Sequence, residues 1–234
     1  MNISKYKNIY QLTFARYLFP INCFVIEREN DLVVIDMGLK NFNKEIVKLQ
    51  RSTGKNVSML LLTHAHSDHV NGTNTFRKYF KNAEIGISKR ESYLLNGDMR
   101  LLKDESQNKI RGGFSRGIIH TDFTFEEGDV FDSIQVINTP GHTPGSVSFY
   151  LPANRSIIVG DAFQTKGRPA VSGDLNITFP FPALATWDKK TALNSAYKIK
   201  ELHASSLFCG HGHFIIHPEK EINQAIKHLE KKLL

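Results

Sequence analysis

Four potential metal ligands stand close together after one apolar run of the chain: His64, His66, Asp68 and His69. The run at 59–62 has the composition of a buried strand. In an extended segment the side chains at positions i and i+2 point the same way, so His64 and His66 can reach one metal ion. If the backbone then turns into a helix, Asp68 and His69 can reach a second ion. Imidazole and carboxylate groups are typical zinc ligands, and the cluster therefore predicts a metal centre.

Three further candidate ligands follow other apolar runs. His142 stands in a Pro- and Gly-rich loop after 136–137, Asp161 follows 157–159 and a glycine, and His211 follows 207–209 between two glycines. Ligands delivered at the ends of strands are a common way for a rigid scaffold to hold a metal site. One Gly-Asp or Gly-His pair is usually only a turn. Together with the first cluster, the three pieces favour a hydrolytic centre with two metals.

The first half of the chain alternates strand-like and helix-like patterns around these residues. We expect a strand hairpin, a helix, a strand, a second helix and a further strand, at 24–26 with 32–35, 41–53, 57–62, 71–80 and 83–87. Residues 96–122 are polar, basic and glycine-rich, which indicates a long connection or a lid.

The second half is also rich in strands. Strands are expected at 130–131, 134–137, 147–151 and 157–159, followed by an irregular interruption at 162–186. A helix over 187–202, a short strand at 207–209 and an amphipathic helix over 219–233 complete the chain. Two sheets with helices on their outer faces are the economical packing of such elements.

Composition bounds the class of protein. The chain has 234 residues, of which 41% are hydrophobic and 23% charged, as expected for one globular domain over 1–234. The net charge of +7 is spread along the chain, which favours a solvated basic surface over a nucleic-acid interface.

Cys23 and Cys209 stand among apolar neighbours, which favours buried, reduced thiols. The N-terminus has no long apolar run and no segment could span a bilayer, so we expect a cytoplasmic protein.

The motifs resemble those of the metallo-β-lactamase superfamily. The resemblance is carried by 64–69, 139–146, Gly160-Asp161 and 209–212, and by the hairpin 22–38 that closes on Asp36-Met37-Gly38. It implies an α+β fold, a four-layer αββα sandwich with the metals at one edge of the two sheets. It also implies that one metal takes His64, His66 and His142, that the other takes Asp68, His69 and His211, and that Asp161 bridges them.

The ligand set predicts a two-metal hydrolytic site, and the resemblance implies a dinuclear zinc-dependent hydrolase in which a metal-bridging hydroxide cleaves an ester, thioester or lactone. Two Zn²⁺ per chain are expected, although histidine and carboxylate ligands also accept iron or manganese. Asp68 is the candidate catalytic residue, because it could relay a proton to the leaving group besides binding metal. The expected partner is a small-molecule substrate, with nucleic acid disfavoured and no membrane. The sequence indicates neither the natural substrate nor the oligomeric state.

Departures from other members of the superfamily narrow the reaction. One class of β-lactamases places a cysteine where this chain has Asp161, and quorum-quenching lactonases place a tyrosine where it has Gln164. Glyoxalase II carries a helical glutathione-binding domain, which we do not expect in the few residues after His211. Two alternatives stay open: a mononuclear iron persulfide dioxygenase, and a phosphodiesterase or nuclease favoured only by the net charge.

Asp36 and a group of three aromatic residues near the motifs each allow two interpretations. Asp36 supports either its own turn or the metal ligands. The aromatic residues Phe179, Phe181 and Trp187 either form the wall of a hydrophobic substrate pocket or pack their own proline-stiffened loop onto the body of the protein.

Overall fold

A computed structural model describes residues 1–115, 117 and 119–234, and contains two main sheets. The first sheet has the order β1-β2-β3-β4-β5-β6-β7. Its strands are Asn2–Tyr6, Ile9–Phe14, Ile21–Glu27, Asp31–Ile35, Asn56–Leu62, Glu84–Ser88 and Phe123–Phe125. The pairs from β1 to β4 are antiparallel and those from β4 to β7 are parallel.

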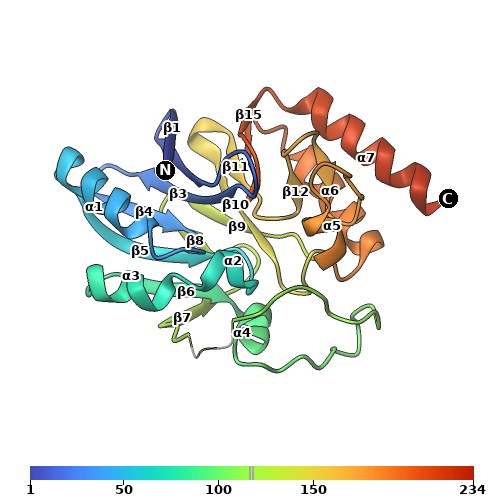
Figure 1. Ribbon diagram of the computed structural model, residues 1–234, viewed down its shortest axis with the longest axis horizontal. Coiled ribbons are helices and arrows are strands. Elements are labelled where there is room, and N and C mark those ends of the chain that lie inside the picture. Colours follow the sequence, from blue (N-terminus) through green and yellow to red (C-terminus); the bar gives the residue numbers. More distant parts are fainter. Residues whose placement is uncertain (116, 118) are drawn as a thin grey trace.

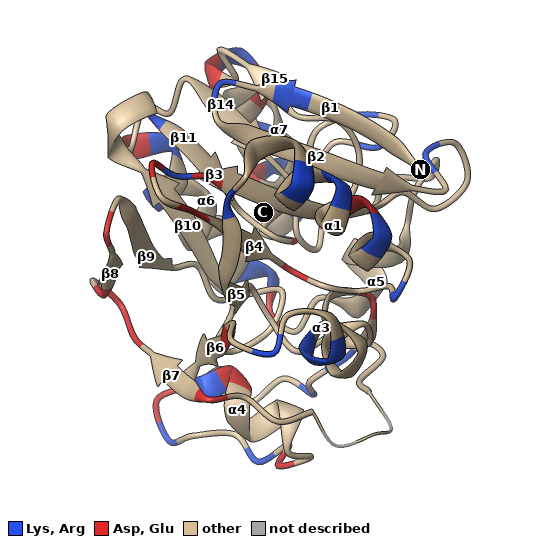
Figure 2. Cartoon of the chain, turned by 90° about the vertical axis from the view of Figure 1, so that its left-hand side faces the viewer, with Lys and Arg blue, Asp and Glu red and all other residues tan. Residues whose placement is uncertain are grey.

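The second sheet has the order β15-β14-β11-β10-β9-β8. In chain order its strands β8, β9, β10, β11, β14 and β15 are Val130–Phe131, Ile134–Asn138, Val147–Leu151, Ser156–Ile158, Ser206–Phe208 and Ile215–Ile216. A separate two-stranded sheet joins β12 (Phe163–Gln164) to β13 (Ala170–Val171). Charged residues gather on helices and loops and leave most of the central strands uncharged (Figure 2).

Helices cover the outer faces of the two main sheets (Figure 1). The helices α1 (Phe42–Thr53) and α3 (Thr73–Tyr79) lie beside the first sheet, and α6 (Lys189–Glu201) and α7 (Glu219–Leu233) lie beside the second. Three shorter helices connect strands: α2 (Ser67–Val70), α4 (Lys89–Leu95) and α5 (Phe181–Ala185).

The alternation of side chains along the strands explains the layers. In β4, Leu32 and Val34 join the cluster that includes Phe42 of α1, whereas Val33 and Ile35 join the cluster shared with the second sheet. A third cluster packs the outer face of the second sheet against α6 and α7. Because successive side chains of a strand point to opposite faces, a strand between two layers must be apolar at every position. The predicted four-layer αββα sandwich is confirmed.

The structure differs from the sequence prediction in several short elements. An N-terminal hairpin, β1 with β2, precedes the first predicted strand, and β1 is an edge strand in which Ile3 and Lys5 are exposed. The predicted helix over 71–80 is α3 at Thr73–Tyr79, and a separate short helix, α2, precedes it at Ser67–Val70. The irregular stretch 162–186 contains β12, β13 and α5. Elements of two to seven residues carry too few apolar positions to show a period.

The two cysteines are free and lie in different layers. Cys23 belongs to the cluster under α1, and Cys209 to the cluster under α6 and α7, so both are buried and cannot pair with each other. Among the described residues, no helix combines the length and the apolar character that crossing a bilayer requires.

We expect neither thiol to react in the folded protein. Burial removes both side chains from solvent and raises the pKa of Cys23 and of Cys209, so little thiolate is accessible. A chromogenic thiol reagent should therefore titrate no cysteine under native conditions and both in concentrated guanidinium chloride. Rapid modification of either residue without denaturant would contradict this placement in the outer layers.

Candidate metal centre

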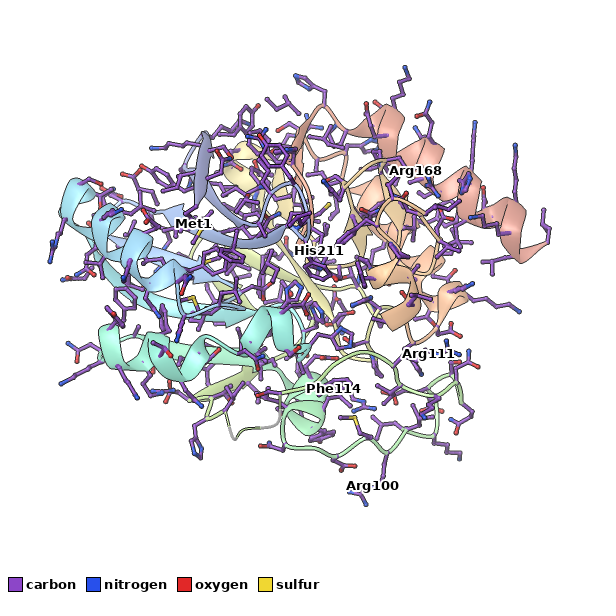
Figure 3. The ribbon with its side chains drawn as sticks, viewed as in Figure 1. Met1, Arg100, Arg111, Phe114, Arg168 and His211 are labelled. Carbon is purple, nitrogen blue, oxygen red and sulfur yellow. The ribbon has the colours of Figure 1, made fainter. Side chains whose placement is uncertain are left out.

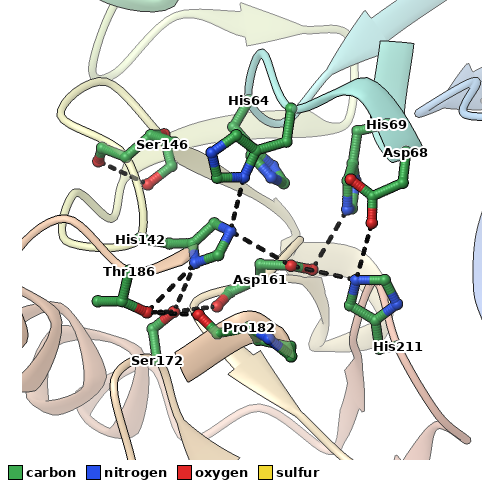
Figure 4. A network of polar contacts seen from close by, with 12 residues as sticks. His64, Asp68, His69, His142, Ser146, Asp161, Ser172, Pro182, Thr186 and His211 are labelled. Atoms are coloured by element: carbon green, nitrogen blue, oxygen red, sulfur yellow. Dashed lines mark hydrogen bonds and ion pairs between the residues drawn. The ribbon is translucent and has the colours of Figure 1, made fainter. Parts of the chain in front are cut away.

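Strand ends deliver the seven predicted ligands to one place (Figure 4). The cluster from His64 to His69 follows β5 and runs into α2, while His142, Asp161 and His211 follow β9, β11 and β14. Their ligand atoms form three groups in which all atoms lie within 4.8 Å of one another: His64, His66 and His142; His64, His69 and Asp161; Asp68, His69 and His211. Each of the three groups is compact enough to hold a metal ion.

Asp161 lies between the two sets of histidines. Its carboxylate oxygens are 3.4 Å from Nε2 of His142, 3.3 Å from Nε2 of His69 and 3.2 Å from Nε2 of His211. Asp68 approaches the second set alone, with Oδ2 3.3 Å from Nε2 of His211. A carboxylate in this central position can contact both metals of a pair, which is the bridging role that the resemblance implies.

Each of the five histidines is held by its second ring nitrogen. The ring N–H groups of His66, His69 and His211 donate to the carbonyl of Arg111 at 2.9 Å, the carboxylate of Asp36 at 2.7 Å and the carbonyl of Pro20 at 2.6 Å. These acceptors fix the tautomer of each imidazole, so the remaining nitrogen keeps its lone pair toward the centre.

Hydroxyl groups fix the other two histidines. Thr63 Oγ1 donates its proton to Asp36 at 2.8 Å, so it can only accept from Nδ1 of His64, 3.0 Å away. Ser172 Oγ likewise donates to the carbonyl of Asp161 at 2.7 Å and accepts from Nδ1 of His142 at 3.0 Å. In both imidazoles Nε2 therefore carries the lone pair, as a metal ligand must.

Burial makes these atoms suited to metal cations. Nε2 of His64, Nε2 of His69 and Oδ1 of Asp161 are buried and make no hydrogen bond within the described residues. Such unsatisfied polar atoms are costly unless an ion or another partner contacts them. Burial also lowers the pKa of His142 to about 3, so this imidazole is neutral near pH 7. Its Nε2 lies 2.9 Å from Nδ1 of His66, close enough for both nitrogens to contact one cation. The residues present fit two divalent cations.

The second set of ligands is electrically different. Burial alone would lower the pKa of His211, but the carboxylate of Asp161 and that of Asp68 raise it to about 10. Two carboxylates thus favour positive charge at this end of the site. A divalent cation supplies that charge in place of a proton.

Of the two roles predicted for Asp36, the structure favours support of the candidate metal ligands. It is fully buried and has a left-handed backbone conformation, with φ of 60°. Its carboxylate accepts from the backbone N–H and the hydroxyl of Thr63, both at 2.8 Å, and from His69. One side chain therefore orients a ligand of each predicted metal, because Thr63 in turn holds His64.

Sequence analysis missed Glu91, a buried carboxylate at the start of α4. The spacing of Ser88 and Glu91 resembles a capping box, and Ser88 Oγ does accept from the N–H of Glu91 at 3.2 Å. The Glu91 side chain instead accepts from the N–H groups of Ala65 and Gly145, each at 2.8 Å. It thereby ties the loop of His64 and His66 to the loop of His142.

The predicted lid contributes a wall of the site through its backbone; its residues 116 and 118 lie outside the described part of the chain. The carbonyl of Arg111 holds His66, the carbonyl of Gly113 accepts from Ser67 N at 2.8 Å, and the Phe114 ring lies 4.9 Å from that of His66. A Cβ on Gly112, where φ is 100°, would lie 2.1 Å from Nε2 of His66. Only glycine fits there.

A cavity of about 380 Å³ opens above the candidate ligands. Its floor includes His66, Asp68, His142, Asp161 and His211, and its apolar walls are Phe19, Phe181, Pro182 and Leu184. Of the three aromatic residues with two interpretations, Phe181 lines this cavity. Phe179 is buried and packs its ring 5.1 Å from that of His211, and Trp187 is buried outside the cavity.

The fold and the site define a member of the metallo-β-lactamase superfamily, and the sequence model of that superfamily matches residues 16–211. The chain belongs to this family. It is 42% identical over 232 residues to the protein YobT of Bacillus subtilis (strain 168), covering 99% of this chain and 100% of YobT.

More distant relatives show the breadth of the superfamily. A hydroxyacylglutathione hydrolase of Mesorhizobium japonicum is 30% identical over 166 residues, which are 69% of this chain and 51% of that enzyme. The crystal structure of the DIM-1 metallo-β-lactamase superposes with a TM-score of 0.74 at 16% identity, covering 99% of this chain and 97% of the other, and confirms the fold.

The two adjacent glycines of the lid give a matched pair of variants. Gly112→Ala should displace His66, because the new Cβ would overlap its ring, whereas a Cβ on Gly113 comes no closer than 3.5 Å to Ser67 Oγ. We expect Gly112→Ala to lower the metal content and Gly113→Ala to leave it unchanged, as measured by elemental analysis of folded protein. Equal metal content in the two variants would contradict the proposed contact between the lid and His66.

Glu91→Gln should weaken metal binding without unfolding the chain. The N–H groups of Ala65 and Gly145 donate to different carboxylate oxygens, and in glutamine one of these oxygens is replaced by an NH2 group, which cannot accept. Supporting groups around metal ligands typically change affinity about 10- to 100-fold, and we expect a loss in that range in a competition assay with a chelator. Glu84→Gln, a change of the same kind at an exposed position of β6, is the control. Matching affinities for the two variants would show that Glu91 serves the helix alone.

Proposed function

We propose that the protein is a dinuclear zinc hydrolase that cleaves an ester, thioester or lactone. The observation that carries the proposal is the central position of Asp161 between two sets of histidines whose lone pairs face inward. Two divalent cations bound there would lower the pKa of a shared water, supply hydroxide near neutral pH and polarise a substrate carbonyl.

The protein's own residues would hold the metals, hold a proton for the leaving group and exclude water. The buried ligands hold the two positions rigid, because each is fixed by a hydrogen bond on its outer side. Asp68 is the ligand whose side chain is most open to the cavity, at 27% exposure, so it is placed to hold a proton for the leaving group. The apolar walls exclude water from the substrate's acyl part.

The cavity favours a carbonyl substrate over a phosphodiester. No lysine or arginine is among the described residues that line it, so nothing beyond the metals would balance the charge of a diester backbone. The similarity to a hydroxyacylglutathione hydrolase supports an acyl compound in the same way. We therefore propose a small-molecule substrate and no nucleic acid.

Asp161→Ala should abolish hydrolysis and lower the bound metal at both positions. We expect protein purified without added metal or chelator to contain about two zinc ions per chain, as in other two-metal sites, and the variant to hold less than one. His213→Ala is the control, since His213 shares the turn of His211 but does not line the cavity. Activity is measured against a panel of esters, thioesters and lactones.

Three results would contradict the proposal. Full activity in the Asp161 variant would exclude a bridging role. One iron per chain with oxygen uptake would favour a persulfide dioxygenase. Strong, salt-sensitive binding and cleavage of RNA or DNA would favour a nuclease.

A further inference from the structure

A second depression lies beside the metal cavity and is lined by positive charge. It has a volume of about 650 Å³, and four exposed cations line it: Lys109 and Arg111 from the lid, and Lys189 and Lys190 from the start of α6. Its other lining residues include Trp187 and Leu233. We call this depression the basic groove.

The four cations have no side-chain partner among the residues that the structure describes. None of them makes a side-chain hydrogen bond or ion pair in the described part of the chain, whereas many other surface cations do. Unpaired like charges gathered around one concave surface repel one another. A bound anion would relieve this repulsion, so the arrangement favours anion binding in the groove.

The single carboxylate of the groove is already engaged. Asp188 Oδ1 accepts from the N–H and the hydroxyl of Thr191 at 2.7 Å, and Oδ2 accepts from Ser106 at 2.9 Å and Asn108 at 2.7 Å. These bonds join the lid to α6. Asp188 thus forms part of the groove wall, and its carboxylate makes no direct contact that would neutralise the lysines of the groove.

The basic groove adjoins the metal cavity. Leu184 lines both depressions. The side chain of Arg111 lines the groove while its backbone carbonyl holds the ligand His66 at 2.9 Å. Figure 3 shows Arg111 between the lid and the helices α5 and α6. A ligand with its reacting carbonyl over the metals could therefore extend past Leu184 into the groove.

We propose that the basic groove binds phosphate groups on the leaving part of the substrate. The inference rests on the proposed hydrolase activity and specifies its substrate class: an acyl thioester or ester of a phosphorylated small molecule. In the reaction, the oxygen of water forms a bond to the acyl carbon and the bond from that carbon to sulfur or oxygen breaks. The leaving atom takes up a proton, and the acid and the phosphorylated thiol or alcohol are released.

The shape of the groove favours a small molecule over RNA. Its volume lies within the range of small-ligand pockets, about 300–1,000 Å³. Trp187 anchors one wall by donating its Nε1–H to the carbonyl of Asn108 at 2.9 Å. An RNA-binding protein needs a basic stripe that follows the backbone over several nucleotides, and the four cations are confined to one depression.

Two substrates with the same acyl group test the proposal. The butyryl thioesters of pantetheine and of coenzyme A differ in the phosphorylated nucleotide part of the leaving group. We expect kcat/KM to be higher for the coenzyme A thioester, and this preference to decline as salt is added. In Lys189→Ala/Lys190→Ala the preference should fall roughly threefold to tenfold, while kcat/KM for the pantetheine thioester stays unchanged.

Lys220→Ala/Lys227→Ala removes the same charge from α7 outside the groove and should keep the preference. Calorimetric binding of coenzyme A itself, also weakened only by the first double variant, tests the groove without any hydrolysis. If neither thioester is cleaved but coenzyme A binds in this way, hydrolysis of such thioesters is excluded and the groove stands. Equal kcat/KM for both thioesters, no binding of coenzyme A, or lysine-dependent binding of RNA alone would overturn the groove proposal.

Discussion

The buried carboxylate of Asp161 is the constraint on which the site depends. It is 4% exposed and lies within 3.4 Å of imidazole nitrogens contributed by three separate loops. A carboxylate removed from water is destabilising unless opposite charge surrounds it. Without metal, a protonated His211 can supply part of that charge, because the carboxylates of Asp161 and Asp68 raise its pKa to about 10. Two divalent cations held between the imidazoles and Asp161 would supply the charge in place of that proton. The sandwich brings together the loops that follow β5, β9, β11 and β14. Positive charge can therefore be gathered around the carboxylate of Asp161.

Orientation is set outside the ligands, by groups whose own protons are already committed. The hydroxyl of Thr63 gives its proton to Asp36, and that of Ser172 gives its proton to a carbonyl, so each can only accept from a histidine. Asp36 links ligands of both predicted metals, and Glu91 ties two ligand loops together. Removing one such group would leave its buried partners unsatisfied as well as free to move. The rigidity of the centre is therefore shared among several residues.

The sequence predicts the ligands better than it predicts what holds them. His64, His66, Asp68 and His69 form a short motif, and His142, Asp161 and His211 each follow an apolar strand, so local patterns are enough to select the candidate ligands that the structure brings together. The alternating layers of the sandwich are likewise visible in runs such as β4. Glu91, by contrast, has the spacing of an ordinary helix cap, and its contacts with Ala65 and Gly145 depend on tertiary packing. The acceptor on His66 is a backbone carbonyl, which no residue type can reveal.

In the lid, backbone atoms contact the predicted metal site, and different atoms, those of the side chains, are placed to contact the substrate. Its backbone contacts the predicted metal site, through the carbonyl of Arg111 and the absence of a side chain at Gly112, whereas Lys109 and Arg111 line the basic groove. The same segment can therefore hold His66 with one set of atoms and contact a leaving group with another. If the groove binds substrate as proposed, a substitution of Lys109 would alter recognition without moving a predicted ligand, whereas a change of backbone path at Gly112 would alter both. Substrate range in such a scaffold can diverge through lid side chains as long as the lid backbone keeps its contact with His66.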